Sequence, residues 1–169
     1  MNCLNDSFCC PPNTCEDVLK GLMDIQQDLI AKGNIKECYV IFDDCIDQEQ
    51  FASPVLKQLT VQLRHFHITL IFSTQYANLV PTRMRTNCMG TMIFKTDSEC
   101  NLKALFQSYG QQFDNYQAFK AYLMKNTGNH KFLYYDKRDV SENISDTYKV
   151  MLCPAKIPKF KIKIRDGIN

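Results

Sequence analysis

The stretch Tyr39-Val40-Ile41-Phe42-Asp43-Asp44 gives the strongest indication of the fold. From Cys38 to Phe42 the chain is continuously apolar, with β-branched and aromatic members, and the run is too short for a helix. Because polar and apolar residues do not alternate in it, the run is typical of a strand buried on both faces of a parallel sheet. We therefore expect a buried β-strand that delivers two acidic side chains to one edge of a sheet.

Helical and strand patterns alternate around this run. A helical apolar stripe extends from Thr14 to Gly33, and a second helix is predicted from about Pro54 to His65. A second buried strand, Ile68–Phe72, and a third, Met92–Phe94, follow. Strand, helix and strand in this order indicate a right-handed crossover in a parallel α/β sheet. The later elements are expected to be two helices and two strands, at Ser98–Tyr109, Tyr116–Lys125, His130–Tyr135 and Tyr148–Cys153.

The length and composition indicate one globular domain. With 169 residues, 45% of them hydrophobic and 22% charged, the chain is long enough for one real core. We expect an irregular segment at 1–13, a single α/β domain at 14–153 and a basic tail at 154–169. The sequence shows no signal peptide and no apolar run of the roughly 18–20 residues that span a bilayer. The chain is therefore interpreted as soluble and intracellular, without a membrane partner.

The basic tail and the cysteines leave alternatives open. The net charge of +2 is too small to indicate nucleic acid by itself. The cations of the tail could contact DNA phosphates, belong to a solvated terminus, or, over Lys159–Ile164, lie on an edge strand. The nine cysteines are an odd number, and those near the N-terminus lack regular metal-site spacing. Reduced thiols are therefore favoured over a metal site.

Two adjacent acids end the first predicted strand. In an open parallel sheet, ligands bind outside the carboxyl ends of the strands. Asp43 and Asp44 lie at such an end, where a pair of carboxylates is costly unless a positive charge is near. A magnesium ion on nucleotide phosphates would supply that charge, with one carboxylate holding the ion and its neighbour positioning the attacking water. The alternative is that both acids begin a solvated loop or cap a helix.

Gln75 and the loop before the third strand extend this pattern. An amide at the end of the second strand could contact a γ-phosphate or orient water, although a lone Gln is by default a turn residue. Arg83 and Arg85 could stabilise charge on a transferring phosphoryl group, in cis or from a neighbouring subunit. Each arginine taken separately is better explained as a surface residue. The order and spacing of all three features together favour a nucleotide site.

Three stretches together resemble the viral genome-packaging ATPases of large DNA viruses. They are Tyr39–Asp44, Arg64–Gln75 and Pro81–Asn87. These ATPases are poxvirus-type members of the FtsK/HerA superfamily of P-loop ATPases. In that family an acid pair called Walker B is followed by a helix, a strand ending in Thr-Gln and a loop with an Arg-x-Asn motif. The resemblance, which covers about Glu37 to Lys95, implies a partial P-loop NTPase fold of the RecA/ASCE type. Such a fold has a mostly parallel sheet flanked by helices.

The resemblance implies roles for the residues at the strand ends. Asp43 resembles the Walker B acid that holds magnesium. Asp44 occupies the place of the catalytic acid, which is usually Glu in the wider class, and an Asp reaches less far. Gln75 resembles the sensor residue that contacts the nucleotide.

The loop before the third strand also has a counterpart in the family. Arg85 resembles the arginine of the Arg-x-Asn motif, with Arg83 as an alternative trans-acting finger and Asn87 as a residue that orders the loop. By the same resemblance, ATP and Mg²⁺ are the expected cofactors. Double-stranded DNA, a homo-oligomeric ring and capsid proteins are the expected partners, in the host cytoplasm, a viral factory or the virion.

One element of the family pattern has no match. A P-loop ATPase needs G-x-x-x-x-G-K-[ST] to hold the phosphates, and none of the six glycines here is followed by Lys-Ser or Lys-Thr. The chain is therefore expected to be the C-terminal part of such an ATPase, from a truncated or split reading frame or acting with another chain. In the family, the P-loop strand lies beside the sensor strand. We therefore expect an exposed edge at Ile68–Phe72, or a rearranged sheet, and a tendency to associate.

Three functions follow from these observations. The main hypothesis is an ATP-hydrolysing motor module that moves viral double-stranded DNA into capsids and is incomplete in this chain. The alternative is a non-catalytic P-loop-like module for assembly or DNA binding. A thiol enzyme that pairs Cys45 with His65 or His67 is disfavoured, because these histidines precede the second strand and so lie at the other end of the sheet.

Overall fold

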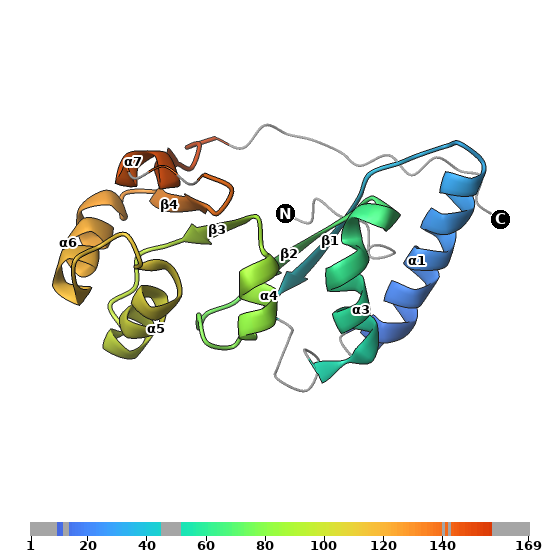
Figure 1. Ribbon diagram of the computed structural model, residues 1–169, viewed down its shortest axis with the longest axis horizontal. Coiled ribbons are helices and arrows are strands. Elements are labelled where there is room, and N and C mark those ends of the chain that lie inside the picture. Colours follow the sequence, from blue (N-terminus) through green and yellow to red (C-terminus); the bar gives the residue numbers. More distant parts are fainter. Residues whose placement is uncertain (1–9, 12–13, 45–51, 140, 142, 157–169) are drawn as a thin grey trace. The chain divides into compact units, whose positions relative to one another are not determined.

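The computed structural model describes residues 10–11, 14–44, 52–139, 141 and 143–156 (Figure 1). The chain groups into two units, of which the first comprises Met1–Ile41, Ala52–Ile71 and Ala155–Asn169 and the second Phe42–Phe51 and Phe72–Pro154. No helix among the described residues is both long and apolar enough to span a bilayer. Cys45 and most of the irregular N-terminal segment and the basic tail lie outside the described residues.

The first unit contains helices and most of a two-stranded sheet, whose last residues belong to the second unit. Helix α1 (Cys15–Ala31) contacts α3 (Pro54–Gln62) and the short 3-10 helix η3 (Leu63–Phe66). Strands β1 (Cys38–Asp43) and β2 (Ile68–Ser73) lie side by side (Figure 1). All of these elements coincide, within a few residues at their ends, with those that the apolar patterns predicted.

The two strands are parallel, as predicted. The backbone N–H of Cys38 donates to the carbonyl oxygen of His67 at 2.9 Å, and that of Asp44 donates to Ser73 at 3.0 Å. The connection between the strands runs through α3, which makes the expected strand–helix–strand unit. Among the described strands, β2 pairs only with β1.

A buried amide aligns the starts of both strands. Gln26 on α1 is 4% exposed, and its Nε2 donates to the carbonyl oxygens of Lys36 at 2.9 Å and Phe66 at 2.7 Å. The first carbonyl precedes β1 and the second precedes β2, so one side chain holds both chain segments that enter the sheet. Gly33 ends α1 with φ +67°, a conformation that favours glycine because it has no Cβ.

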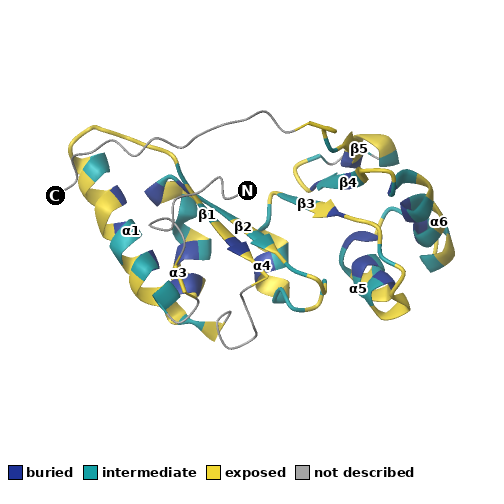
Figure 2. Ribbon diagram, turned by 180° about the vertical axis from the view of Figure 1, so that it is seen from behind, coloured by how far each residue is buried: buried dark blue, intermediate teal, exposed yellow. Residues whose placement is uncertain are grey.

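The expectation that β1 is buried on both faces is wrong. Tyr39 and Ile41 are 67% and 61% exposed, whereas Phe42 on the opposite face is 7% exposed. Ile71 of β2 is also exposed, and Figure 2 shows the exposed positions along both strands. A parallel sheet buries both faces only when helices cover both. In the described part of this unit, helices cover one face, so the apolar run identified the strand but not its burial.

The second unit contains a three-stranded sheet with helices. Its described elements are α4 (Thr82–Asn87), β3 (Gly90–Ile93), α5 (Glu99–Tyr109), α6 (Tyr116–Asn126), β4 (Lys131–Asp136), α7 (Ile144–Thr147) and β5 (Tyr148–Leu152). The strand order is β3-β4-β5, and both pairs are antiparallel. The register places Leu133 opposite Ile93 on one side and opposite Val150 on the other.

This sheet corrects the prediction of a mostly parallel arrangement. Two successive helices, α5 and α6, connect β3 to β4 and return the chain to the end of the sheet that it left, so β4 runs opposite to β3. In the segment from β4 to β5, the described residues form the one-turn helix α7, and the segment is short for a parallel crossover, which needs a dozen or more residues. Parallel pairing is therefore limited to β1 and β2 among the described strands.

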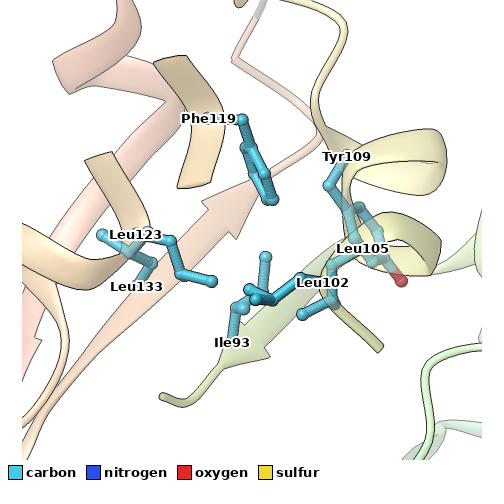
Figure 3. Close-up of a cluster of buried hydrophobic side chains, with 7 residues drawn as sticks. All are labelled: Ile93, Leu102, Leu105, Tyr109, Phe119, Leu123 and Leu133. Atoms are coloured by element: carbon cyan, nitrogen blue, oxygen red, sulfur yellow. The ribbon is translucent and has the colours of Figure 1, made fainter. Parts of the chain in front are cut away.

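The core of the second unit lies between its sheet and the pair α5 and α6. Figure 3 shows the buried cluster, which consists of Ile93, Leu102, Leu105, Tyr109, Phe119, Leu123 and Leu133. The α5 and α6 members recur every three or four residues and thus form one face of each helix. Burial of these side chains is the main favourable contribution to the folding of this unit.

Candidate functional site

The carboxyl ends of β1 and β2 bring two of the predicted site residues together. Asp43 is the last residue of β1, and Asp44 follows it. Gln75 lies two residues beyond the end of β2, and its Nε2 donates to Oδ2 of Asp44 at 2.6 Å. Parallel strands end at the same edge of a sheet, so the pairing of β1 with β2 explains why residues 31 positions apart meet here.

The acidic side chains at this edge are accessible. Asp43, Asp44 and Gln75 are exposed, and Asp43 makes no side-chain hydrogen bond or ion pair within the part of the chain that the structure describes. Asp44 has φ +48°, a backbone conformation that Asp adopts more readily than bulky residues. Next to these residues in the sequence, the rings of Phe42 and Phe72 stack with centroids 5.2 Å apart. The ring pair ties the two strand ends together while the polar groups face solvent.

Asn101 holds the chain segment that carries Gln75. It lies in the first turn of α5, after the Ser98 hydroxyl, which accepts the N–H of Asn101 at 3.4 Å. Its Nδ2 donates to the carbonyl oxygen of Gln75 at 3.0 Å, and its Oδ1 accepts the N–H of Ala77 at 3.0 Å. Sequence reasoning missed this residue. A side-chain amide contacting a segment 24 and 26 positions away leaves no local pattern in the sequence.

Arg85 also contacts the segment from Gln75 to Ala77. Its Nη1 donates to the carbonyl oxygen of Ala77 at 2.9 Å, and its Nη2 donates to Oγ1 of Thr82 at 3.0 Å. Ala77 therefore accepts from Arg85 and donates to Asn101, so a continuous set of hydrogen bonds runs from Gln75 through Asn101 and Ala77 to the guanidinium. The structure links the predicted sensor and the predicted arginine through the backbone, and no direct contact joins their side chains among the described hydrogen bonds.

The predicted loop before the third strand is a helix. Residues Thr82–Asn87 form α4, which has a single buried residue, Met84. Such a short helix shows no apolar repeat, which is why the pattern of the sequence did not reveal it. Arg83 and Asn87 are exposed, and neither side chain makes a hydrogen bond to another described residue. Arg85, and not Asn87, makes the side-chain contacts that connect this helix to the preceding segment.

The residues present fit one part of a magnesium-nucleotide site and not the other. Magnesium on nucleotide phosphates needs only one or two protein carboxylates, because waters and phosphate oxygens complete its octahedral shell. Asp43 and Asp44 meet that need as a pair, and the described residues contain no cluster of three or more metal-binding side chains. The backbone cradle for the phosphates has no counterpart, because the sequence contains no G-x-x-x-x-G-K-[ST].

A separate ion-pair cluster lies at the end of β4. The Asp136 side chain is 8% exposed and accepts two side-chain hydrogen bonds from Arg138, from Nε at 2.9 Å and from Nη2 at 3.0 Å. Lys149 on β5 adds a third at 3.3 Å. These contacts, the Arg138 side-chain bonds above all, hold the pKa of Asp136 well below its usual range. Because its own partners neutralise the carboxylate, we assign it to stability and not to the candidate site.

Relatives of the chain occur in two viruses. No protein-family model matches the chain. Uncharacterized protein 075L of Invertebrate iridescent virus 6 is 32% identical over 125 residues, which are 72% of this chain and 48% of the relative. Uncharacterized protein L437 of Acanthamoeba polyphaga mimivirus is 27% identical over 162 residues, which are 89% of this chain and 56% of the relative. The chain thus spans about half the length of the curated relatives it matches.

Solved structures give the likeness in fold. The genome packaging NTPase B204 from Sulfolobus turreted icosahedral virus 2, in complex with AMPPCP, matches 80% of this chain and 60% of its own. The match has a TM-score of 0.54 at 18% identity. The complex of the same NTPase with ATP-gammaS matches 66% of this chain and 50% of its own, with a TM-score of 0.48 at 20% identity. The chain therefore has, over most of its length, part of the fold of a viral genome packaging NTPase.

Proposed function

We propose that the chain is part of an ATP-hydrolysing motor of the FtsK/HerA type that packages viral double-stranded DNA. Its contribution to the nucleotide site is the acid pair Asp43 and Asp44. The observation that carries the proposal is the 2.6 Å contact between Gln75 and Asp44 at the shared carboxyl edge of two parallel strands. In this arrangement an exposed carboxylate and an exposed amide converge where open α/β sheets bind ligands. The shared fold with a packaging NTPase supports the same function.

Within this proposal each strand-end residue has a distinct role. Asp43 has a carboxylate without a protein partner in the described part of the chain, which suits a ligand of magnesium. A hydrogen bond holds the side chains of Asp44 and Gln75 together. The attacking water would be oriented between the carboxylate of Asp44, which accepts a hydrogen bond, and the amide of Gln75. The metal, when bound, neutralises charge on the phosphates. Asp44 is shorter than the usual Glu, so the water would lie closer to the backbone.

The arginines are proposed to act on the phosphoryl group of a neighbouring subunit. Arg85 has an anchored guanidinium that uses two of its five N–H donors within its own loop. Arg83 is exposed and is the alternative finger. The hydrogen bonds through Asn101 and Ala77 would make the position of Arg85 sensitive to that of Gln75, which is a way to couple nucleotide state to a subunit interface.

The partners of the proposed motor follow from the packaging role. They are ATP with Mg²⁺, double-stranded DNA, further copies in a homo-oligomeric ring, and capsid proteins, in the host cytoplasm, a viral factory or the virion. The unpaired edge of β2 supports association with another polypeptide segment, since unpaired strand edges are sites of strand addition. The basic residues after Pro154 would contact DNA phosphates without sequence specificity.

A second candidate function is a non-catalytic module for assembly or DNA binding. One observation favours it, namely that this sequence contains no phosphate cradle. Such a module would keep the fold and its contacts with other subunits but would hydrolyse no nucleotide.

Steady-state ATP hydrolysis distinguishes the two functions. This chain alone is expected to hydrolyse ATP near background. A longer form that includes a G-x-x-x-x-G-K-[ST] segment should show DNA-stimulated turnover that falls by about 100-fold or more in Asp44→Asn. The matched control is Asp114→Asn, which changes an exposed acid in the second unit. Turnover of the longer form that Asp44→Asn and Gln75→Ala leave intact would contradict the proposal.

A further inference from the structure

The second unit contains a polar pocket that is separate from the acid pair. Its volume is about 270 Å³, and it lies among the segment after β2, helices α4 and α5, and the end of β4. The polar part of its wall includes Thr82, Arg85, Gln107, Ser108, Gln111 and Lys137. Neither Asp43, Asp44 nor Gln75 lines it.

The charged side chains that line the pocket are all positive. Arg85 and Lys137 both line it, and no Asp or Glu is among the described residues of its wall. Neither cation forms an ion pair with a described residue. The nearby buried Asp136 does not compensate them, because Arg138 and Lys149 already neutralise it. Two cations without a counter-charge favour an anionic ligand.

The two cations are held in place by backbone carbonyls. Arg85 donates to the carbonyl oxygen of Ala77, as described above, and the Lys137 Nζ donates to the carbonyl oxygen of Thr86. The backbone N–H of Lys137 donates to Met89 at 3.1 Å. A lysine ammonium has three donors and a guanidinium five, so both keep donors for a ligand.

The rest of the wall also offers donors. Gln107 and Gln111 are exposed side chains that make no hydrogen bond to another described residue, and so their amides are available. Thr82 and Ser108 contribute hydroxyl groups. Several N–H and O–H donors around two cations match a ligand with many acceptor oxygens and a negative charge.

We propose that this pocket binds a phosphate group, either free phosphate or the terminal phosphate of a nucleotide. A phosphate carries between one and two negative charges near neutral pH and oxygens that accept from several donors. A volume of about 270 Å³ leaves room for a phosphate group together with bound water. A DNA duplex would instead need a row of cations, whereas this wall has two. The inference does not depend on hydrolysis at Asp44.

The test is titration of this chain with inorganic phosphate in a phosphate-free buffer, followed by NMR amide shifts. The expected result is saturable shifts at Arg85, Gln107 and Lys137, with an affinity that falls as salt rises. A parallel titration with ADP identifies the source of the phosphate. Tighter binding of ADP at the same residues assigns the pocket to a nucleotide, and equal or weaker binding assigns it to free phosphate.

Two variants with matched controls make the result specific. Gln107→Glu places a negative charge in the wall without removing a protein contact, and should weaken phosphate binding by about tenfold. Its control is Gln117→Glu, the same change on an exposed position of α6 outside the pocket. Lys137→Met should weaken binding by at least as much, and Lys103→Met on the exposed face of α5 should not.

Four outcomes would overturn the proposal. They are an absence of saturable shifts, equal effects of Gln107→Glu and Gln117→Glu, shifts that require DNA, and phosphate binding that Asp44→Asn abolishes. The last would place the phosphate at the strand ends, so the inference would fail while the proposed function gained support. Conversely, phosphate binding in the pocket together with catalysis insensitive to Asp44→Asn would reject the proposed function alone.

Discussion

The two sheets of the molecule share one pattern of burial but differ at the ends of their strands. The antiparallel sheet β3-β4-β5 packs one face on α5 and α6, where Leu133 is 0% exposed, and leaves Met92 and Leu152 more than half exposed. The parallel pair β1 and β2 likewise buries Phe42 and Ile68 and leaves Tyr39 and Ile41 more than half exposed. Both sheets arise from similar apolar runs in the sequence, so the runs do not determine burial.

This difference separates stability from function. In the antiparallel sheet, β4 ends in Asp136, whose carboxylate is paired with Arg138 and Lys149. The parallel pair ends in exposed Asp43, Asp44 and Gln75. A carboxylate that no protein cation neutralises can take a metal ion as its counter-charge. The candidate site therefore lies at the ends of β1 and β2 and not at the end of β4.

The largest expected effect tests the packing of the second sheet. Phe119→Ala removes a ring that is 0% exposed and should lower the free energy of unfolding by about 3–5 kcal/mol. Phe94→Ala removes a ring that is 56% exposed and stacks on Phe132, so it should cost about 1 kcal/mol. Urea denaturation measures both. Equal losses would show that the core is not where the structure places it.

A smaller loss is expected when the buried amide of the first unit is removed. Gln26→Leu leaves the carbonyl oxygens of Lys36 and Phe66 without their donor, which should cost about 1–3 kcal/mol. Gln27→Leu, on an exposed neighbour, is the matched control and should change stability by less than about 0.5 kcal/mol. Equal effects of the two variants in urea denaturation would mean that Gln26 does not align β1 with β2.

The ion pair of Asp136 should make the second unit sensitive to acid. Its pKa is depressed in the folded chain, so its contribution to stability is present above the ordinary carboxyl pKa of about 3.9 and decreases as the pH falls below it. The Tm difference between the wild type and Asp136→Asn should therefore be constant from pH 7 to 5 and shrink toward pH 2. We expect a moderate effect, because Arg138 and Lys149 keep solvent contact.

The control for the acid effect is Asp114→Asn, which alters an exposed carboxylate of the same unit. It should give a Tm difference near zero at every pH. A difference for Asp136→Asn that stays unchanged down to pH 2 would contradict the role of the Arg138 contact.

The smallest effect on global stability is expected at Asn101. Asn101→Ala removes the acceptor of the Ala77 N–H and the donor to Gln75, so hydrogen exchange at Ala77 should accelerate while the Tm changes little. Asn101→Asp keeps the acceptor and should preserve the slow exchange of Ala77. Unchanged exchange in Asn101→Ala would show that the segment from Gln75 to Ala77 is held by other contacts.

Much of this architecture follows from local patterns. Apolar periodicity predicted α1, α3, α5 and α6, and apolar runs predicted all five described strands within a few residues. The approach of Gln75 to Asp44 followed from the rule that parallel strands end together. Local patterns do not reveal the direction of β4, because it depends on the two helices that lie between β3 and β4. They also do not reveal the contacts of Asn101, because these join segments that are distant in the sequence.

The most direct test of the account is metal binding at the ends of β1 and β2. Mn²⁺ prefers the same oxygen ligands as Mg²⁺ and broadens the NMR signals of nearby nuclei. Titration of this chain with Mn²⁺ should broaden the amides of Asp43, Asp44 and Gln75 first, and Asp43→Asn should abolish the effect while Asp114→Asn leaves it unchanged. Broadening that begins elsewhere, or that survives Asp43→Asn, would contradict the assignment of this edge as the place where the carboxylates of a magnesium-nucleotide site lie.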